Sequence, residues 1–327
     1  MLLLHLPEDV LYHILSYLDY KSLSRLSQVC KIINRFVSRD VVWRKIAKQF
    51  LNTGITWNGT DIYPHIPLKQ RIRTAQNWYD GVCRRSISVR WKTNDGKILI
   101  HSRGSDMTLG LFGHGQEVNC LDCKDELIIS GSRDRTARIW TLTSSSSRAT
   151  IPMFDRVWSV AISPTGSSFA TGTSCCENSS PIRIWDVERS ACVCRLGTEF
   201  RRGAGVLDIV FESPFQLFTC GYDTFIRLWD LRLSPQKCVR EWEEPHDSTL
   251  YCIQTDKNHM IASGSSYYGV VRLWDKRQTK CLQFFQLSSD PVSSPVYCLR
   301  FSSSHLYAAL ATALHSLDFR QSPTYIR

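Results

Sequence analysis

Three side chains in the middle of the chain are of the types that form a nucleophilic catalytic site. His114, Ser130 and Asp134 supply the base, the hydroxyl and the carboxylate of a Ser/His/Asp arrangement. Similar sets recur further along the chain, namely Thr219, Asp223 and Trp229, and then His246, Ser263 and Trp274. Because a catalytic set is needed only once, we interpret the recurring residues as structural and keep a hydrolase as an alternative.

Cysteine is the other residue type that could carry chemistry. Cys120 and Cys123 have CxxC spacing but fall on a predicted strand, where alternation turns them to opposite faces. Two further close pairs, Cys175 with Cys176 and Cys192 with Cys194, lack a second ligand pair at zinc spacing. The sequence also has no Gly-rich phosphate loop and no HExxH motif, so we expect neither a metal nor a cofactor.

Cysteine number and the opening residues bear on the cellular compartment. The 13 cysteines are odd in number and scattered, and the first apolar run stops at His5, too short for an export signal or a membrane span. These features predict reduced thiols, no membrane association and a cytoplasmic or nuclear location.

The charge is unevenly distributed along a chain of ordinary composition. Hydrophobic residues make up 43 % of the 327, as in a folded protein, and the formal net charge is +10. Residues 1–85 hold 13 basic and 6 acidic residues, against 27 and 24 in residues 86–327. A basic segment of this kind suits nucleic acid, an acidic membrane surface or an acidic protein, so its pattern has to decide.

Residues 86–327 consist of short β-rich runs that repeat. Trp140, Trp185, Trp229 and Trp274 end equivalent runs 45, 44 and 45 residues apart, and adding 45 again reaches Phe319. Each period holds four alternating apolar runs, which is typical of one blade of a β-propeller. The spacing therefore predicts a mainly β fold of five to six recognisable blades.

Residues 6–46 have a different period. Leu11, Ile14, Leu15 and Leu18 recur at spacings of three and four, and two further sets of this kind follow. The pattern predicts several short amphipathic helices, with starts near Pro7, Asp19, Ser22 and Asp40. About 40 residues make a small core, so we expect part of this apolar surface to pack on a partner.

The run LPEDVLYHILSYLD, followed by SLSRLSQVCKIIN and DVVWRKI, closely resembles an F-box, and the Trp-Asp pairs at 185–186, 229–230 and 274–275 resemble the WD repeat. The combination is similar to the F-box/WD repeat family. Runs such as EWEEPHDSTLYC and SSYYGVVRLWD are most like its dactylin-type members. The resemblance implies an F-box at 1–46, a helical linker at 47–85 and a WD-repeat propeller at 86–327.

The family resemblance implies a substrate receptor of a ubiquitin ligase that has no catalysis of its own. The F-box would bind a Skp-type adaptor and, through it, a cullin scaffold, and the basic charge suits an acidic adaptor. The residues that match the family's contact or core positions are Leu6, Pro7, Leu11, Ile14, Leu15, Leu18, Leu23, Val29 and Trp43. We expect Leu6, Pro7 and Ile14 to contact the partner, and Ile33 and Phe36 to pack internally.

In WD repeats, residues of the types His114, Ser130, Asp134 and Trp140 form a buried hydrogen-bond relay, which is the structural role expected for the recurring sets above. The first blade is incomplete, because residues 95–101 fit its third strand and only the stretch from Ile87 to Trp91 precedes them. The chain therefore resembles a form shortened between Trp91 and Asp95. Ile87 to Trp91 could instead supply a last strand after Phe319, and ring closure stays open.

The expected substrate surface is the mouth of the propeller. Propeller geometry selects Glu117, Asn119, Arg133, Arg156, Trp158, Tyr222, Tyr251 and Tyr297. Arginine forks at Arg133 and Arg156, with Arg201 and Arg202, suggest a phosphorylated or acidic protein substrate. Two alternatives remain: a scaffold or decoy that binds the adaptor without presenting substrate, and a nucleic-acid binder, for which few basic residues interleave with aromatics.

Overall fold

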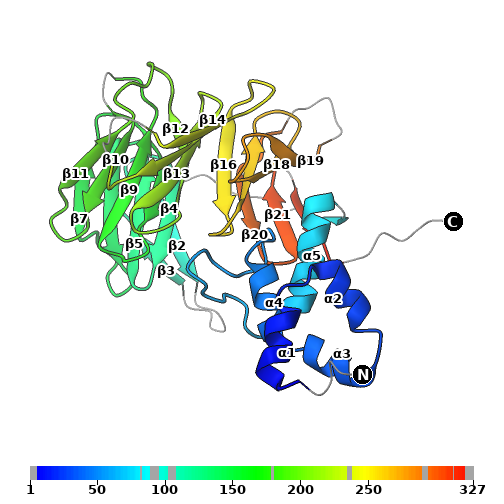
Figure 1. The fold of residues 1–327 in the computed structure, drawn as a ribbon. Coiled ribbons are helices and arrows are strands. Elements are labelled where there is room, and N and C mark those ends of the chain that lie inside the picture. The colour runs from blue at the N-terminus through cyan, green and yellow to red at the C-terminus, as the bar shows by residue number, and fades with distance from the viewer. Residues whose placement is uncertain are drawn as a thin grey trace.

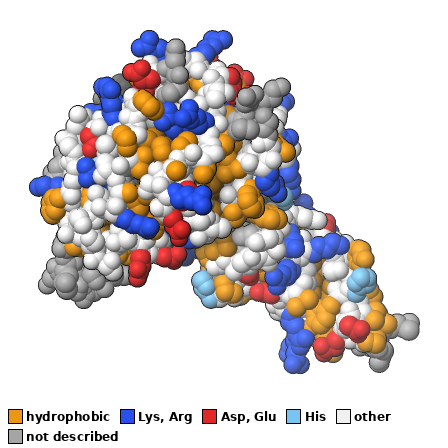
Figure 2. Space-filling model, turned by 90° about the vertical axis from the view of Figure 1, so that its left-hand side faces the viewer, with side chains coloured by type: hydrophobic (Ala, Val, Ile, Leu, Met, Phe, Trp, Pro, Cys, Tyr) orange, Lys and Arg blue, Asp and Glu red, His pale blue; other side chains and the backbone are white. Residues whose placement is uncertain are grey.

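The computed structural model describes residues 6–81, 83–88, 96–101, 108–177, 180–233, 238–288, 294–311 and 313–320. Within them the helices come first and the strands follow (Figure 1). Figure 2 shows a large lobe, built from the sheets, joined to a smaller helical lobe. The predicted fold class, a helical N-terminal region followed by repeated β-sheets, is confirmed.

Four short helices form the smaller lobe: α1 (Glu8–Leu15), α2 (Tyr20–Leu26), α3 (Lys31–Val37) and α4 (Asp40–Ala47). Their starts follow local chemistry. Pro7 precedes α1 and two acidic residues occupy its first turn, where the helix dipole favours negative charge. The Asp19 carboxylate accepts the Ser22 backbone N–H at 2.7 Å and so caps α2.

One hydrophobic core holds these helices together. Leu11 and Leu15 of α1, Leu23 of α2 and Trp43 of α4 are buried in it, and the Trp43 indole donates to the Val37 carbonyl at 2.5 Å. Leu68 and Ile72 of a fifth helix, α5 (Leu68–Asp80), complete the cluster. The four short helices are therefore stabilised by the segment that follows them.

The segment from residue 48 to α5 also binds the sheets. The Asn52 backbone N–H donates to Asp256 at 2.8 Å, and the Asn52 side chain donates to the Ser302 carbonyl at 2.7 Å. Trp78 of α5 is buried, donates from its indole to the Ser303 carbonyl at 3.0 Å, and stacks on Phe319 with ring centroids 3.7 Å apart. The connector is therefore anchored at both ends, which fixes the helical lobe relative to the sheets.

Five four-stranded antiparallel sheets make the larger lobe. Four of them each consist of four strands that follow one another in the sequence. The first two sheets are β4 (Val118–Lys124), β5 (Leu127–Ser132), β6 (Thr136–Thr141) and β7 (Ala149–Pro152), and then β8 (Val157–Ile162), β9 (Ser168–Thr173), β10 (Ile182–Asp186) and β11 (Cys192–Leu196). The next two are β12 (Val206–Phe211), β13 (Gln216–Gly221), β14 (Phe225–Asp230) and β15 (Arg240–Glu243), and then β16 (Leu250–Thr255), β17 (Met260–Ser265), β18 (Val270–Asp275) and β19 (Cys281–Gln286). Each is one blade of a propeller.

The fifth sheet joins the two ends of the strand region. β20 (Cys298–Phe301), β21 (His305–Ala309) and β22 (Leu314–Asp318) are followed in space by β1 (Arg84–Ser88), which pairs antiparallel with β22. An N-terminal strand thus supplies the last strand of this blade. It begins three residues before the stretch from Ile87 to Trp91 that the sequence suggested, and residues 89–91 lie outside the described residues.

Close packing joins successive blades. The innermost strands contact one another in the series β4, β8, β12, β16 and β20. Gly131 on the second strand, β5, permits a close approach to β8 of the next blade, because a Cβ atom there would lie 2.4 Å from Val157. Within the described residues no comparable contact joins β20 back to β4, so the ring of four-stranded blades is open at that point.

A two-stranded sheet, β2 (Ile98–His101) with β3 (Thr108–Leu111), lies against β5 and β6, the middle strands of the first four-stranded blade. Ile98 and Leu111 pack with Ile128 and Trp140. The predicted incomplete first blade is therefore present as half a blade. The point of shortening between Trp91 and Asp95 lies outside the described residues.

Candidate functional site

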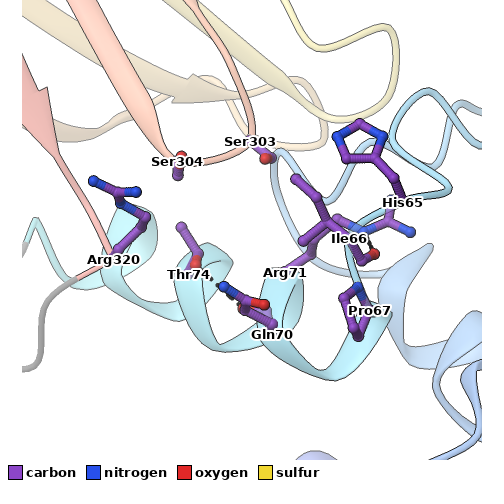
Figure 3. A pocket seen from close by; sticks show the side chains of 9 residues that line it. All are labelled: His65, Ile66, Pro67, Gln70, Arg71, Thr74, Ser303, Ser304 and Arg320. Carbon is purple, nitrogen blue, oxygen red and sulfur yellow. Dashed lines mark hydrogen bonds between the residues drawn. The ribbon is translucent and has the colours of Figure 1, made fainter.

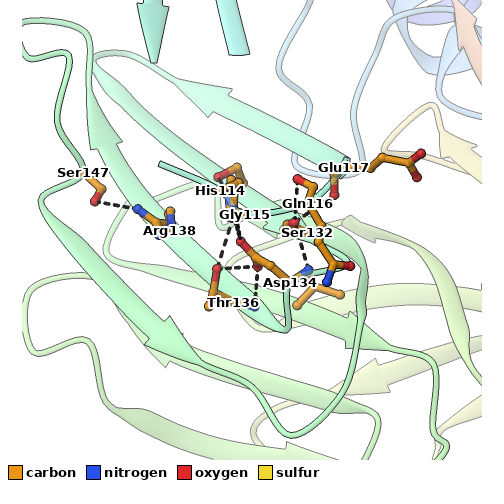
Figure 4. Close-up of polar contacts among 12 residues, drawn as sticks. His114, Gly115, Gln116, Glu117, Ser132, Asp134, Thr136, Arg138 and Ser147 are labelled. Atoms are coloured by element: carbon orange, nitrogen blue, oxygen red, sulfur yellow. Dashed lines mark hydrogen bonds and ion pairs between the residues drawn. The ribbon is translucent and has the colours of Figure 1, made fainter. Parts of the chain in front are cut away.

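The relay of the first four-stranded blade is complete. His114 binds the Asp134 carboxylate through Nδ1 at 2.8 Å and the Ser130 hydroxyl through Nε2 at 2.7 Å, and the Trp140 indole donates to Ser130 at 2.8 Å. Figure 4 shows the part of this network around His114 and Asp134, where Thr136 donates to Asp134 at 2.6 Å. The relay connects the loop before β4 with β5, β6 and the turn between them.

The electrostatics of the relay favour a neutral histidine. Burial lowers the pKa of His114, and the neighbouring Asp134 carboxylate opposes this shift. Burial also acts to raise the pKa of Asp134, but hydrogen bonds from Thr136, His114 and the Gly115 N–H outweigh it and lower the pKa overall. A neutral ring that donates from Nδ1 accepts the Ser130 proton at Nε2. The contact pattern is that of a Ser/His/Asp site, but Ser130 has no exposed surface and a substrate carbonyl cannot reach it.

Other blades keep only part of the relay. In three of them an indole donates to a hydroxyl: Trp229 to Thr219 at 2.9 Å, Trp274 to Ser263 at 2.8 Å, and Trp185 to Thr171 at 2.9 Å, a pair that the sequence reading missed. Asp223 forms an ion pair with Arg227 instead of binding a histidine. The shared element is therefore the tie between the second and third strands.

His246 does not take the histidine position of its blade. Its side chain is exposed, and the described hydrogen bond at this residue uses its backbone carbonyl, which accepts from Ser248. Arg272 on β18 of this blade instead forms a buried ion pair with Glu244, which follows β15, with N–O distances of 2.8 Å. The sequence assignment of His246 to a relay is thus corrected, because the turn before β16 carries the imidazole to the surface.

An exposed apolar surface lies on the helical lobe (Figure 2). Leu6, Val10 and Ile14 are 38–40 % exposed, and Val10 and Ile14 share one side of α1 at a spacing of four. Pro7 is exposed beside them, and Val29 in the turn after α2 is exposed as well. Several apolar side chains in a lobe of this size mark an interaction surface.

Four of the nine predicted adaptor residues are interior. Leu11, Leu15, Leu23 and Trp43 have at most 2 % of their surface exposed, and Leu18 is partly buried. These side chains hold the helices in place, so their effect on a partner is indirect. Ile33 is also buried, and Phe36 packs edge-on against Tyr12 with centroids 5.5 Å apart.

At the mouth of the blades, one group forms around Arg133. Its guanidinium pairs with Glu117 at 3.0 Å and lies 5.7 Å from the centre of the Trp158 ring. Asn119 donates to the Val157 carbonyl at 2.9 Å, which ties β4 to β8. Arg156 is exposed with no described side-chain partner, so it is the more available arginine of the two.

A second group is aromatic. Tyr251 and Tyr297 meet edge to face with centroids 5.7 Å apart, and burial together with Tyr222 and Tyr297 raises the pKa of Tyr251. Tyr267 and Tyr268 are also exposed. They lie in the turn between β17 and β18, which corresponds to the turn of the first four-stranded blade that contains Arg133. The sequence reading missed this pair, although aligning SSYYG with SRDRT places it at the same mouth.

A pocket of about 200 Å³ lies where the connector meets the last blade (Figure 3). Gln70 and Thr74 of α5 line one side, Ser303 and Ser304 the other. Arg71 points its guanidinium away to Asp61 at 2.8 Å, and Arg320 is paired with Asp318 at 2.8 Å. The two arginines that line the pocket are thus neutralised by carboxylates of the same chain.

Two features are absent from the described part of the chain. No group of three or more His, Cys, Asp and Glu side chains there has the arrangement of a metal site. No helix in the described ranges is long and apolar enough to cross a bilayer.

Comparison with known proteins agrees with this geometry. The F-box-like family model matches residues 3–49, and the WD domain, G-beta repeat model matches residues 105–141 and 236–275. The human F-box/WD repeat-containing protein 4 is 47 % identical, over 96 % of this chain and 92 % of that protein. This chain belongs to the F-box/WD repeat family. The mouse protein of the same name is also 47 % identical, with 96 % and 93 % covered.

More distant matches include a solved structure with the same fold and a ligase subunit. The crystal structure of the Doa1 WD40 propeller domain superposes with a TM-score of 0.53 at 20 % identity, over 68 % of this chain and 69 % of that one. A protein of Arthroderma otae described as a probable E3 ubiquitin ligase complex SCF subunit, sconB, is 27 % identical over 45 % of this chain and 23 % of its own length. F-box/WD repeat proteins are typically non-catalytic adaptors.

Proposed function

We propose that this protein is the substrate-recognition subunit of a Skp-cullin-F-box ubiquitin ligase. The helical lobe would bind the Skp-type adaptor, and the blades would hold the substrate. The anchored connector keeps the two surfaces at a set separation, so bound substrate is brought near the ubiquitin-transfer machinery and the reaction gains from proximity. The chain needs no catalytic group or cofactor for this role.

The observation that carries the proposal is the exposed apolar side of α1. Leu6, Val10 and Ile14 expose apolar surface although the lobe has its own filled core. Exposed basic residues lie on α2 and α3 of the same lobe, including Lys21, Arg25 and Arg35, which favours an acidic partner. Exposed apolar side chains together with charged residues are typical of a protein interface.

The adaptor test compares two exposed apolar residues of the same chain. Ile14→Asp places a carboxylate in the proposed interface, where burial without a partner is costly, so capture by a purified Skp-type adaptor should fall at least about tenfold. Val193→Asp, on the outer strand β11, is the matched control and should leave capture unchanged. Equal capture by wild type and Ile14→Asp, measured by pull-down with adaptor and cullin, would refute the adaptor site.

For the substrate we propose a phosphorylated or acidic segment held at the mouth of the blades. Arg156 offers a guanidinium with no described partner, and Arg133 would have to exchange Glu117 for the ligand. Arg156→Ala should therefore weaken binding of a phosphopeptide library more than Arg133→Ala, with adaptor capture retained. Unchanged phosphopeptide binding in the double variant would remove the acidic class from consideration.

A decoy that binds the adaptor without presenting substrate is the second candidate. The open ring and the half blade favour it. Limited proteolysis of the adaptor-bound chain separates the two, because a receptor needs blades that resist digestion. For either role we propose a cytoplasmic or nuclear location, which the odd, scattered set of cysteines favours.

A further inference from the structure

The half blade lacks its two inner strands within the described residues. In the neighbouring blade the third strand, β6, pairs with β5 on its inner side and β7 on its outer side. Among the described residues β2 pairs with β3 alone, and Ile98 and Leu111 pack against Ile128 and Trp140 of the next blade, as the third and fourth strands of a complete blade would. The inner edge of β2 therefore presents backbone N–H and C=O groups that a strand could pair with.

The length of the relatives gives the size of the missing part. The alignment with the human protein spans 380 positions but includes 96 % of the 327 residues here, so about 66 positions of that relative face no residue of this chain. At the 44–45 residues of one period, about 66 residues make one and a half blades. Added to five blades and a half, they would complete a ring of seven.

The absence of these inner strands from the described residues leaves one apolar side chain of the next blade exposed. Leu121 on β4 is 50 % exposed. Its counterparts on the inner strands of the other four blades, identified by the strand register, are only 0–7 % exposed: Val160, Ile209, Ile253 and Leu299. Leu121 thus occupies a position that is otherwise buried.

The other blades also show what covers such a position. Ile209 packs in one cluster with Ala170 of the preceding blade's second strand, and Ile253 packs with Phe218 in the same way. The cover is an apolar side chain on an antiparallel strand that is hydrogen-bonded to the third strand of its blade. That strand is the one missing beside β2.

We propose that this open position accepts an extended segment of another protein, with apolar residues at alternate positions, which pairs antiparallel with β2 and covers Leu121. The backbone of the segment would satisfy the free edge, and its alternate side chains would restore the buried contact, as in strand addition to other sheets. This inference adds a binding site to the proposed receptor function. Only the conclusion that the captured protein is then ubiquitinated rests on that proposed function.

The probe is a fluorescent synthetic peptide with the sequence of residues 118–132, the strand pair that fills this position in the next blade. Fluorescence anisotropy with the full chain should show saturable binding, and hydrogen exchange at residues 98–101 should slow when peptide is added. Leu121→Asp should weaken binding about tenfold or more, whereas Val193→Asp, equally apolar and 62 % exposed on β11, should not.

Three results would overturn the proposal. They are no saturable binding, equal binding by Leu121→Asp and wild type, and a wild-type dimer in light scattering that Leu121→Asp dissociates, which would make a second copy the occupant. A peptide with Pro at the position of Ile129 serves as the ligand control and should bind weakly, because Pro removes a ladder donor. Adaptor capture is measured on the same preparations, so failure here leaves the adaptor result separate.

Discussion

Replacing Trp78 with alanine tests whether the connector determines function. Trp78 is fully buried between α5 and the last blade, donates to the Ser303 carbonyl at 3.0 Å, and stacks on Phe319. Truncation of a buried tryptophan costs about 3–5 kcal/mol, and here it also leaves a buried carbonyl without its donor. We therefore expect Trp78→Ala to lower the free energy of unfolding by about 4 kcal/mol.

The same chain offers a matched control in Trp57. This residue lies in the connector too, but its side chain is 64 % exposed, and its contact with the blades uses the backbone N–H, which donates to the Lys257 carbonyl at 3.2 Å. Trp57→Ala should change the free energy of unfolding by less than about 0.5 kcal/mol.

Urea denaturation followed by far-ultraviolet circular dichroism measures both variants. In a reconstituted ligase, Trp78→Ala should keep adaptor capture and lose transfer of ubiquitin to substrate, because the separation between the two surfaces is no longer set. If the stability loss were no greater than that of Trp57→Ala, or transfer were unaffected, the reasoning that the connector is an anchored spacer would be wrong.

Three further predictions concern the blades. Ser130→Ala removes the hydroxyl shared by two buried partners, so thermal unfolding should show a loss of about 1–3 kcal/mol with adaptor capture unchanged; a stable variant would refute the structural role. Gly131→Val should destabilise by at least about 1–3 kcal/mol, because even a Cβ atom there would lie 2.4 Å from Val157; a wild-type melting temperature would contradict it. Asp208 lies on the inner strand β12 and is partly buried, and this burial raises its pKa to about 6. The folded state then binds the proton more tightly than the unfolded chain, so stability should fall as pH rises from about 4 to 6, by at most about 3 kcal/mol, and Asp208→Asn should abolish that slope in denaturation at several pH values.

The repeat of 44–45 residues and the helical period of residues 6–46 predicted most of the fold. A spacing of 44–45 residues between Trp140, Trp185, Trp229 and Trp274 predicts blades, because each indole closes one four-strand unit onto a hydroxyl of the neighbouring strand. Such contacts lie within about ten to fourteen residues, so the pattern of one segment is enough to reveal them. The relay at His114 was predictable for the same reason.

Local sequence patterns could not predict the long-range contacts. The pairing of β1 with β22 joins residues more than 200 positions apart, and nothing in the five residues of β1 specifies that partner. The exposure of Leu121 is similar, since its sequence surroundings match those of Ile209 and Ile253, which are buried. The difference depends on a neighbouring strand, not on the residue.

By itself the sequence determined the two halves of the molecule, the number of repeat periods, the family and the indole–hydroxyl pairs that close three of the blades, because these follow from local spacing and from side-chain type. Only the tertiary structure decided which F-box side chains are interior and which face outward, that Arg133 is already paired with Glu117, and that the connector is bound to the last two blades. Those properties arise when residues distant in the chain compete for the same space and the same hydrogen-bonding groups, and that competition is settled only in the folded chain.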